Sequence, residues 1–464
     1  MTRIVVLGGG PGGYEAALVA AQLGAQITVV DSDGIGGSCV LTDCVPSKTL
    51  IATAEAAWNA AESRRLGVKV RGAEDLGPSA FGVDLARVNT RVRALAQAQS
   101  TDIHDRLTIA GVRVLPGRGR LTSPTAVVAE GNDGTEEELP ADAILVATGA
   151  RPRVLADAMP DGERILTWTQ VYGLTALPEH LIVVGSGVTG AEFASAYNFG
   201  TEVTLVSSRD RVLPGEDADA AAVLEAAFVR RRMNIRSQAR AKKVTRDGDV
   251  VHVELSDGEV ITGSHVLMAV GSVPNTEHIG LAEAGVRLNS GGFVEVDKVS
   301  RTSTRGIYAA GDCTGVLMLA SVAAHQGRIA MQHILGDAVR PLNLRAVAAN
   351  VFTEPEIATV GVSQNEIDRG EVAARTVMLP LATNARAKMQ GLRDGFVKLF
   401  CLPGTGIIIG GVVVAPRASE LIYAVSLAVD CQLSADQVAH AFTVYPSMTG
   451  SIGEAARLLH LPPG

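Results

Sequence analysis

The sequence predicts an α/β protein built from several domains, and two observations lead to that prediction. The chain has 464 residues, which is more than a single hydrophobic core usually supports. A short apolar strand followed by a glycine-rich turn and a helical segment occurs twice, over residues 3–23 and 181–199. Strands that alternate with helices in this way are typical of parallel sheets covered by helices on both faces.

Composition and charge narrow the class of partner. The chain carries 41 Lys and Arg against 49 Asp and Glu, a net charge of -8, and its basic residues form no long run. We therefore expect no nucleic acid partner. No apolar run reaches membrane-spanning length, and the first strand begins too early for a signal peptide. We expect no membrane insertion, a cytoplasmic location and no metal site.

The first repeat has the features of a dinucleotide-binding unit. A strand leads into a glycine-rich turn, an alanine-rich helix follows, and the next strand ends on Asp31. Gly8 permits the tight turn, Gly10 lets the backbone approach a pyrophosphate, and Gly13 allows the helix to pack closely. Because Asp31 can accept hydrogen bonds from a ribose, this segment predicts a Rossmann-like, three-layer domain.

The second repeat places the same spacing at Gly185, Gly187 and Gly190, so we expect a second nucleotide site. Its second strand ends on Ser207, where the first repeat has a carboxylate. Without that acid, and with Arg209 nearby, the site should accept the 2′-phosphate of NADPH, while NADH stays possible. The alternative is that the arginines after this strand are solvated surface residues.

Two further apolar strands end in turns that fit a nucleotide site. The first, over residues 144–152, contains Thr148 and Gly149, and the second, over residues 307–312, ends on Asp312. Between the repeats, Cys39 and Cys44 have four residues between them, whereas the five cysteines as a set are too few for a disulfide scaffold. Such a pair in a cytosolic enzyme favours a catalytic or redox role.

With these residues, the chain resembles the flavoprotein disulfide reductases over nearly its whole length. The segment 36–48 is similar to the redox motif of that family, and Gly311-Asp312 to its flavin-ribityl motif. The resemblance implies an FAD domain split around an NAD(P) domain, and an α+β C-terminal dimerisation domain at a homodimer interface. The expected parts are 1–150 and 276–344 for FAD, 151–275 for NAD(P), and 345–464 for dimerisation.

The resemblance also implies roles for single residues. Cys44 would face the flavin, Cys39 would meet a disulfide substrate, and Lys48 would pair with Glu192 near the flavin. The residues expected to bind FAD are Gly8, Gly10, Gly13, Asp31, Lys48, Thr148, Gly149 and Asp312. Those expected to bind NAD(P) are Gly185, Gly187, Gly190, Ser207, Ser208, Arg209 and Gly271.

The C-terminal segment departs from the family pattern. Where the disulfide reductases have His-Pro-Thr-x-x-Glu, this chain has Tyr445 in place of the histidine and Gly450 in place of the glutamate. A tyrosine is a poor base at neutral pH, since its ordinary pKa is about 10. His325 and His440 offer no obvious substitute, and Asp43 before the second cysteine disfavours its thiolate. We therefore expect slow disulfide exchange.

These departures favour a quinone as the electron acceptor. A quinone accepts a hydride or electrons from the flavin, and no protein side chain has to transfer a proton to or from a sulfur atom. The catalytic residues expected for such an NAD(P)H:quinone reductase are Lys48, Glu192, Cys39, Cys44 and Tyr445, the last as a wall of the acceptor pocket. Soluble transhydrogenase and dihydrolipoamide dehydrogenase remain alternatives, and so does a non-catalytic redox sensor that signals through the cysteines. A mercuric reductase would need a vicinal cysteine pair near its C-terminus, which this chain lacks.

Overall fold

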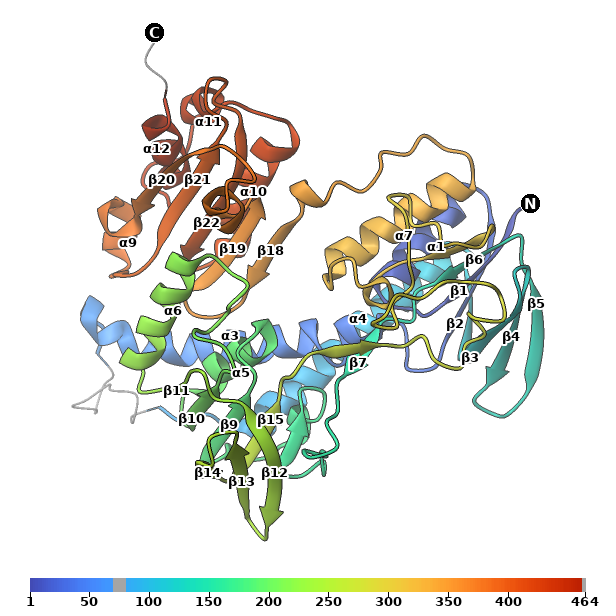
Figure 1. The fold of residues 1–464 in the computed structure, drawn as a ribbon, viewed down its shortest axis with the longest axis horizontal. Coiled ribbons are helices and arrows are strands. Elements are labelled where there is room, and N and C mark those ends of the chain that lie inside the picture. Colours follow the sequence, from blue (N-terminus) through green and yellow to red (C-terminus); the bar gives the residue numbers. More distant parts are fainter. Residues whose placement is uncertain (70–80, 461–464) are drawn as a thin grey trace. The chain divides into compact units, whose positions relative to one another are not determined.

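The protein is described by a computed structural model, which covers residues 1–69 and 81–460 (Figure 1). The chain forms two compact units, each assembled from three separate stretches. Unit 1 contains Met1–Thr49, Asn89–Arg153 and Gly271–Asn343. Unit 2 contains Leu50–Val88, Val154–Val270 and Leu344–Gly464. Helices α3 (Cys44–Glu62) and α4 (Leu85–Ile109) each contribute residues to both units.

Unit 1 is built on a seven-stranded sheet, in the order β17-β6-β1-β2-β3-β4-β5. The strands are β1 (Arg3–Leu7), β2 (Gln26–Asp31), β3 (Arg113–Ser123), β4 (Ala126–Gly131), β5 (Glu136–Pro140), β6 (Ala143–Val146) and β17 (Ile307–Ala309). The pairs from β17 to β3 are parallel, whereas β4 and β5 continue the sheet antiparallel. A separate antiparallel pair joins β7 (Ala150–Pro152) to β16 (Ser272–Pro274).

Both faces of this sheet are buried, as the apolar character of its central strands predicts. Ile4 and Val6 of β1 belong to one hydrophobic cluster, and Val5 and Leu7 to another. Successive residues of a strand point to opposite faces, so β1 has a core on each side. Helices α1 (Pro11–Gln22) and α7 (Ala320–Ile334) pack against each other beside the first cluster. Two short helices of unit 1, α2 (Gly37–Leu41) and η4 (Asp312–Thr314), follow turns.

Unit 2 contains a five-stranded sheet whose strands are all parallel, in the order β11-β10-β9-β15-β8. Its strands are β8 (Ile165–Thr167), β9 (His180–Val184), β10 (Glu202–Val206), β11 (Asn234–Arg236) and β15 (His265–Met268). Helices α5 (Val188–Tyr197) and α6 (Ala218–Arg230) connect these strands, and η3 (Val171–Gly173) follows β8. An antiparallel meander is formed by β12 (Ala241–Asp247), β13 (Val250–Leu255) and β14 (Val260–Gly263).

The last part of unit 2 is an antiparallel sheet in the order β18-β19-β22-β21-β20. Its strands are β18 (Ala348–Val351), β19 (Glu356–Gly361), β20 (Arg375–Pro380), β21 (Phe396–Cys401) and β22 (Ile408–Ala415). The accompanying helices are α8 (Gln364–Asp368), α9 (Ala385–Met389), α10 (Ala418–Asp430), α11 (Ala435–His440) and α12 (Gly450–Leu458), with short turns η5 (Leu344–Ala346) and η6 (Leu381–Thr383). The short turn η1 (Ser63–Leu66) follows α3 in the first stretch of unit 2.

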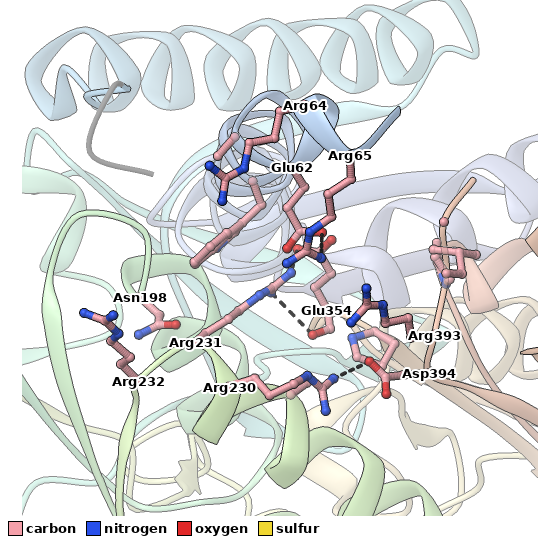
Figure 2. A pocket seen from close by; sticks show the side chains of 17 residues that line it. Glu62, Arg64, Arg65, Asn198, Arg230, Arg231, Arg232, Glu354, Arg393 and Asp394 are labelled. Carbon is pink, nitrogen blue, oxygen red and sulfur yellow. Dashed lines mark hydrogen bonds and ion pairs between the residues drawn. The ribbon is translucent and has the colours of Figure 1, made fainter. Parts of the chain in front are cut away.

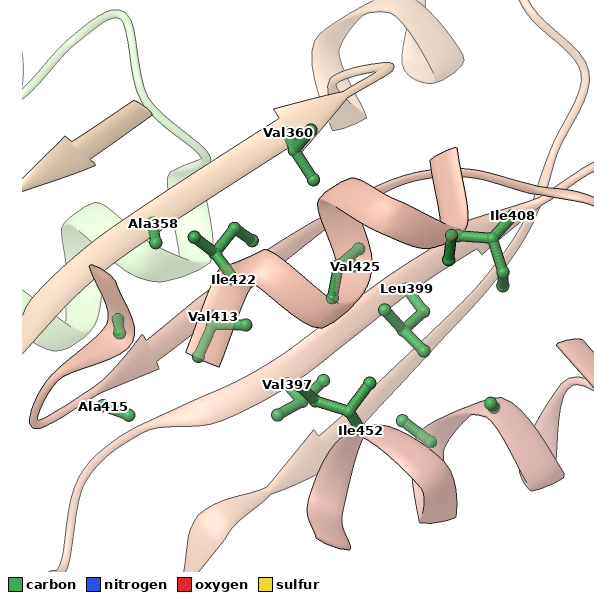
Figure 3. Packing of buried hydrophobic residues seen from close by; sticks show 14 of the residues in the cluster. Ala358, Val360, Val397, Leu399, Ile408, Val413, Ala415, Ile422, Val425 and Ile452 are labelled. Carbon is green, nitrogen blue, oxygen red and sulfur yellow. The ribbon is translucent and has the colours of Figure 1, made fainter. Parts of the chain in front are cut away.

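The core of this last part joins the sheet to two of its helices. Figure 3 shows Val397 and Val413 of the sheet with Ile422 of α10 and Ile452 of α12. All four side chains are at least 96% buried. The fold class expected from the sequence is thereby confirmed: two parallel, helix-covered sheets of the dinucleotide-binding type precede an α+β segment. The bounds of the four segments expected from the sequence stay predictions.

Candidate functional site

The first glycine-rich turn connects β1 to α1 and admits no side chain at two positions. Gly8 has φ +102°, and a Cβ atom there would lie 2.3 Å from the carbonyl oxygen of Ala147. A Cβ at Gly13 would lie 1.9 Å from the carbonyl oxygen of Gly8. Gly10 is the N-cap of α1, and a Cβ there would meet only Gly37, at 3.9 Å. The turn is therefore closed toward the sheet and open in front of the helix.

The second glycine-rich turn, between β9 and α5, repeats this geometry closely. A Cβ at Gly185 would lie 2.2 Å from the carbonyl oxygen of Ala269, and one at Gly190 would lie 1.8 Å from that of Gly185. The N-cap Gly187 has φ -72° and ψ -173°, against -71° and -175° for Gly10. No atom lies within 4 Å of a Cβ built on Gly187.

Both helices that follow these turns can bind an anion at their N-termini. Neither α1 nor α5 has a side-chain hydrogen bond at its N-cap. The first N–H groups of a helix point outward and carry a partial positive charge, so a phosphate in front of them is stabilised. The two turns thus fit the pyrophosphates of two dinucleotides.

The two turns differ where the second strand of each unit ends. Asp31 Oδ2 accepts a hydrogen bond of 2.6 Å from the backbone nitrogen of Gly9, and Oδ1 accepts one of 2.6 Å from that of Gly34. The corresponding Ser207 is fully buried, and its Oγ accepts a bond of 2.7 Å from Ser186 Oγ. The second turn therefore carries a neutral hydroxyl where the first carries a carboxylate.

The loop after Ser207 presents its side chains to solvent. Ser208 and Arg209 are exposed, while Arg211 Nη2 donates to the carbonyl oxygen of Pro214 at 3.4 Å. Gly271, the last residue expected at the NAD(P) site, belongs to unit 1 and has φ +95° with open space around its Cα. The roles of these residues in NAD(P) binding stay predictions.

The remaining residues expected around the flavin lie in unit 1. Thr148 Oγ1 donates to the carbonyl oxygen of Asn275 at 2.7 Å, and Gly149 has φ +69°. Asp312 opens η4 after Gly311, whose backbone nitrogen donates to Gln326 Oε1 at 2.8 Å. Burial, with the negative charge of Asp43 as a second cause, raises the pKa of Asp312 to about 6.

The two cysteines are free thiols whose titrations are linked. Hydrogen bonding between the thiols lowers the pKa of Cys39 and is also the largest cause of the raised pKa of Cys44. The charge of Asp43 raises both pKa values, whereas the charge of Lys48 lowers both. Cys39 is therefore the thiol that ionises first. Lys48 lies four residues after Cys44 on α3, one helical turn further along the same face.

Glu192, the expected partner of Lys48, is buried in α5 of unit 2 with 3% exposure. Its Oε1 accepts a hydrogen bond of 2.9 Å from the backbone nitrogen of Phe352. Sequence reasoning did not find this contact, because nothing in the sequence indicates which backbone group a buried carboxylate will meet. The pairing of Glu192 with Lys48 stays a prediction.

At the C-terminal segment, Tyr445 is 86% exposed, and its hydroxyl has no partner among residues 1–69 and 81–460. It lines a cavity of about 320 Å³ together with Gly450. His440 Nδ1 contacts the carbonyl oxygen of Asp436 at 2.7 Å, and His325 Nδ1 contacts that of Ser321 at 3.0 Å. Both histidines are exposed and bonded to their own helices.

Two absences hold within the described ranges. Among residues 1–69 and 81–460, no group of three or more His, Cys, Asp and Glu side chains could hold a metal ion. In the same part of the chain, every helix is too short or too polar to cross a membrane.

Comparison with known proteins gives matches over nearly the whole chain. Residues 2–327 match the family described as pyridine nucleotide-disulphide oxidoreductase, and residues 347–456 match its dimerisation domain. A relative from Mycobacterium tuberculosis named NAD(P)H dehydrogenase (quinone) is 56% identical, covering 99% of this chain and 94% of its own. A dihydrolipoyl dehydrogenase from Zymomonas mobilis is 33% identical, covering 97% of this chain and 96% of its own. The crystal structure of LpdA from Mycobacterium tuberculosis has a TM-score of 0.94 at 55% identity, covering 99% of this chain and 100% of that one.

Proposed function

Because the chain belongs to the pyridine nucleotide-disulphide oxidoreductase family, a family of flavin- and pyridine-nucleotide-dependent oxidoreductases, we propose that it is an NAD(P)H:quinone reductase. In this proposal FAD binds at Gly8 to Gly13, and NADPH or NADH binds at Gly185 to Gly190. The bound flavin would accept a hydride from the nicotinamide and reduce a quinone. Support comes from the full-length relative that carries this activity in its name.

The glycine turn of unit 1 supports FAD as the resident group. A dinucleotide needs room for its pyrophosphate against the N-terminus of α1, and the open space at Gly10 offers that room. Asp31 holds the turn through Gly9 and Gly34 while keeping lone pairs for a ribose. Thr148, Gly149 and Asp312 complete the proposed set.

Lys48 supplies the positive charge that this chemistry requires. The charge of Lys48 opposes the rise in the pKa of Cys44 and of Asp43, and it contributes to the lowered pKa of Cys39. This ammonium group therefore acts on the whole cysteine segment. A positive charge close to a flavin stabilises the negative charge that the ring gains on reduction. We assign Lys48 this role, with Glu192 as its counter-ion.

The observation that favours a quinone over a disulfide is that the side chain of Tyr445 is exposed to solvent. Thiol–disulfide exchange needs a base that moves protons at sulfur, and the exposed Tyr445 hydroxyl has no partner in the described part of the chain that could make it one. Gly450 offers no carboxylate to orient a base. A quinone needs neither, because its oxygens can be protonated by water after reduction.

We also propose that the protein acts as a homodimer. Residues 347–456 match a dimerisation domain, and within this segment Phe442, Val444 and Tyr445 are 79% or more exposed in the single chain. Three neighbouring large apolar side chains rarely remain in water on a stable protein. A second copy would cover them, and Tyr445 would then line the acceptor pocket.

The test compares acceptors at a fixed concentration of the holoenzyme. Oxidation of NADPH and NADH is followed at pH 7 with a soluble benzoquinone and, in parallel, with lipoamide. Rapid turnover with the quinone and negligible turnover with lipoamide is expected. Comparable turnover with lipoamide would contradict the proposal and would mean that another residue supplies the base.

A further inference from the structure

A cavity of about 670 Å³ lies within unit 2, at the C-terminal ends of α3 and α6 (Figure 2). This volume falls in the range of about 300–1,000 Å³ that is usual for small-molecule sites. Its lining residues belong to the stretches 58–65, 227–232 and 391–394, with a few others between them. None of them is assigned to the oxidoreductase chemistry proposed above.

The wall of this cavity is strongly basic in a protein whose net charge is -8. The arginines that line it are Arg64, Arg65, Arg230, Arg231, Arg232 and Arg393. The carboxylates that line it are Glu62, Glu354 and Asp394. Arginine side chains repel each other when they gather without counter-ions, so an excess of three positive charges makes this cavity suited to an anionic ligand.

One arginine forms a fixed part of the wall. Arg231 Nη2 lies 2.9 Å from Glu354 Oε2, and its guanidinium stacks on the ring of Trp58, with 4.4 Å from Cζ to the ring centroid. Burial raises the pKa of Glu354, and the charge of Arg231 opposes this rise. Arg231 is held from two sides, so the local charge is positioned before any ligand arrives.

Two other arginines have side chains that no group in the described part of the chain engages. Arg230 pairs with Asp394 and Arg65 with Glu62, so each of the three carboxylates already has an arginine partner. Arg232 and Arg393 are exposed, and their guanidinium groups have no partner among residues 1–69 and 81–460. The planar guanidinium group of an arginine can donate two parallel hydrogen bonds to the oxygens of a phosphate.

We propose that this cavity binds a phosphorylated small molecule. Arg232 and Arg393 bind its phosphate, and Arg231, stacked on Trp58, adds positive charge from the wall. This site is separate from both dinucleotide turns, and the proposal does not depend on which electron acceptor the enzyme uses.

The test is calorimetric titration of the holoenzyme with fructose 1,6-bisphosphate and with pyrophosphate. NADP⁺ is kept saturating so that the dinucleotide site at Gly185 to Gly190 is occupied. We expect saturable binding of the bisphosphate at one site per chain, and no binding of fructose. Absence of saturable binding for both probes overturns the proposal, and so does binding that appears only when NADP⁺ is left out.

Variants locate the site. Because a hydrogen bond to a charged group contributes about 1.5–3 kcal/mol, the double variant Arg232→Gln/Arg393→Gln should weaken binding about tenfold or more. Both residues are exposed and unpaired, so the variant should fold and keep normal quinone turnover. Arg118→Gln, which changes an exposed arginine of β3 in unit 1, is the matched control and should bind as the parent does. Equal binding by the parent and the double variant would overturn the assignment.

A second readout uses fluorescence. The chain has two tryptophans, so in a Trp168→Phe variant Trp58 is the sole emitter. Saturating fructose 1,6-bisphosphate should shift or quench this emission with the same midpoint as the calorimetric titration. An unchanged emission spectrum at saturation would contradict the part of the proposal that concerns Trp58.

Discussion

The ammonium nitrogen of Lys398 lies 2.7 Å from Asp217 Oδ2, and each side chain is only 3% exposed. Asp217 also caps α6, because its Oδ1 accepts hydrogen bonds from the backbone nitrogens of Asp219 and Ala220. Lys398 lies on β21 of the antiparallel sheet, so this pair joins that sheet to the N-terminus of α6 inside unit 2. Asp219 adds a second carboxylate 2.6 Å from the same ammonium group.

The first prediction concerns the stability that this pair provides. Lys398→Met should destabilise unit 2 by about 3–5 kcal/mol, because it leaves Asp217 buried without a counter-charge. The measurement is the midpoint of thermal or urea unfolding of the holoenzyme. Lys242→Met is the control, since Lys242 pairs with Glu254 at 2.8 Å but is 67% exposed, and it should leave the unfolding midpoint nearly unchanged. Equal losses in the two variants would mean that burial does not decide the effect.

The second prediction separates the fold from the ligand at the second glycine turn. Gly187→Ala should leave the unfolding midpoint almost unchanged, since its φ of -72° suits alanine and no atom lies within 4 Å of the new methyl group. It should raise KM for NADPH about tenfold or more, because the methyl group would occupy the space of the pyrophosphate. Gly190→Ala should instead lower the unfolding midpoint, as its methyl group would lie 1.8 Å from the carbonyl oxygen of Gly185. A normal KM for Gly187→Ala would show that the pyrophosphate does not lie there.

The sequence predicts the two nucleotide-binding sheets well, because each glycine spacing depends on contacts within about thirty residues. Gly13 and Gly190 are closed by the carbonyl oxygens of Gly8 and Gly185 in their own turns, so the local pattern is sufficient to predict them. Contacts between distant segments are different. The bonds of Glu192 to Phe352 and of Lys398 to Asp217 join residues 160 and 181 positions apart, and no local pattern encodes such a pairing.

The basic cavity of unit 2 shows the same limit. Its arginines come from three stretches of the chain, each of which looks like an ordinary solvated surface segment in the sequence. Only the run Arg230-Arg231-Arg232 gives a local signal, and a short charge run after a helix is usually a solvated surface. The stacking of Arg231 on Trp58 and its ion pair with Glu354 are what distinguish the site.

The third prediction concerns the choice of nicotinamide cofactor. Ser207→Asp would restore the carboxylate that the first turn has at Asp31, and Ser186 Oγ, now 2.7 Å from Ser207 Oγ, could still donate to it. A carboxylate repels a 2′-phosphate and binds a free ribose hydroxyl, so kcat/KM for NADPH should fall about tenfold or more relative to that for NADH. Steady-state kinetics with both nucleotides and a benzoquinone provide the measurement. An unchanged ratio would mean that Ser207 does not face the 2′ position.

The fourth prediction concerns the thiol of Cys39. Hydrogen bonding to Cys44 lowers its pKa, while the charge of Asp43 raises it. Asp43→Asn removes the opposing charge, so the pKa of Cys39 should fall further and its thiolate should form at lower pH. The pH profile of Cys39 alkylation by iodoacetamide, followed by mass spectrometry, should shift to lower pH in this variant. Asp33→Asn, an exposed change on a nearby loop, should leave the profile in place. A shift to higher pH would contradict the assigned role of Asp43.

The last prediction asks whether the missing base explains the proposed acceptor. The double variant Tyr445→His/Gly450→Glu restores the histidine and glutamate that the disulfide reductases carry. Space exists for both changes: Tyr445 is 86% exposed, and a Cβ built on Gly450 meets nothing nearer than Ser447 Oγ, at 3.7 Å. General acid–base catalysis contributes about 10²–10⁴-fold, so lipoamide turnover should rise by at least about tenfold while benzoquinone turnover changes little. Tyr445→Phe is the control, since it removes only the hydroxyl and should raise neither rate. If the double variant gains no lipoamide activity although Cys39 and Cys44 still react with iodoacetamide, the block lies in the cysteine segment, and Asp43 becomes the residue to replace.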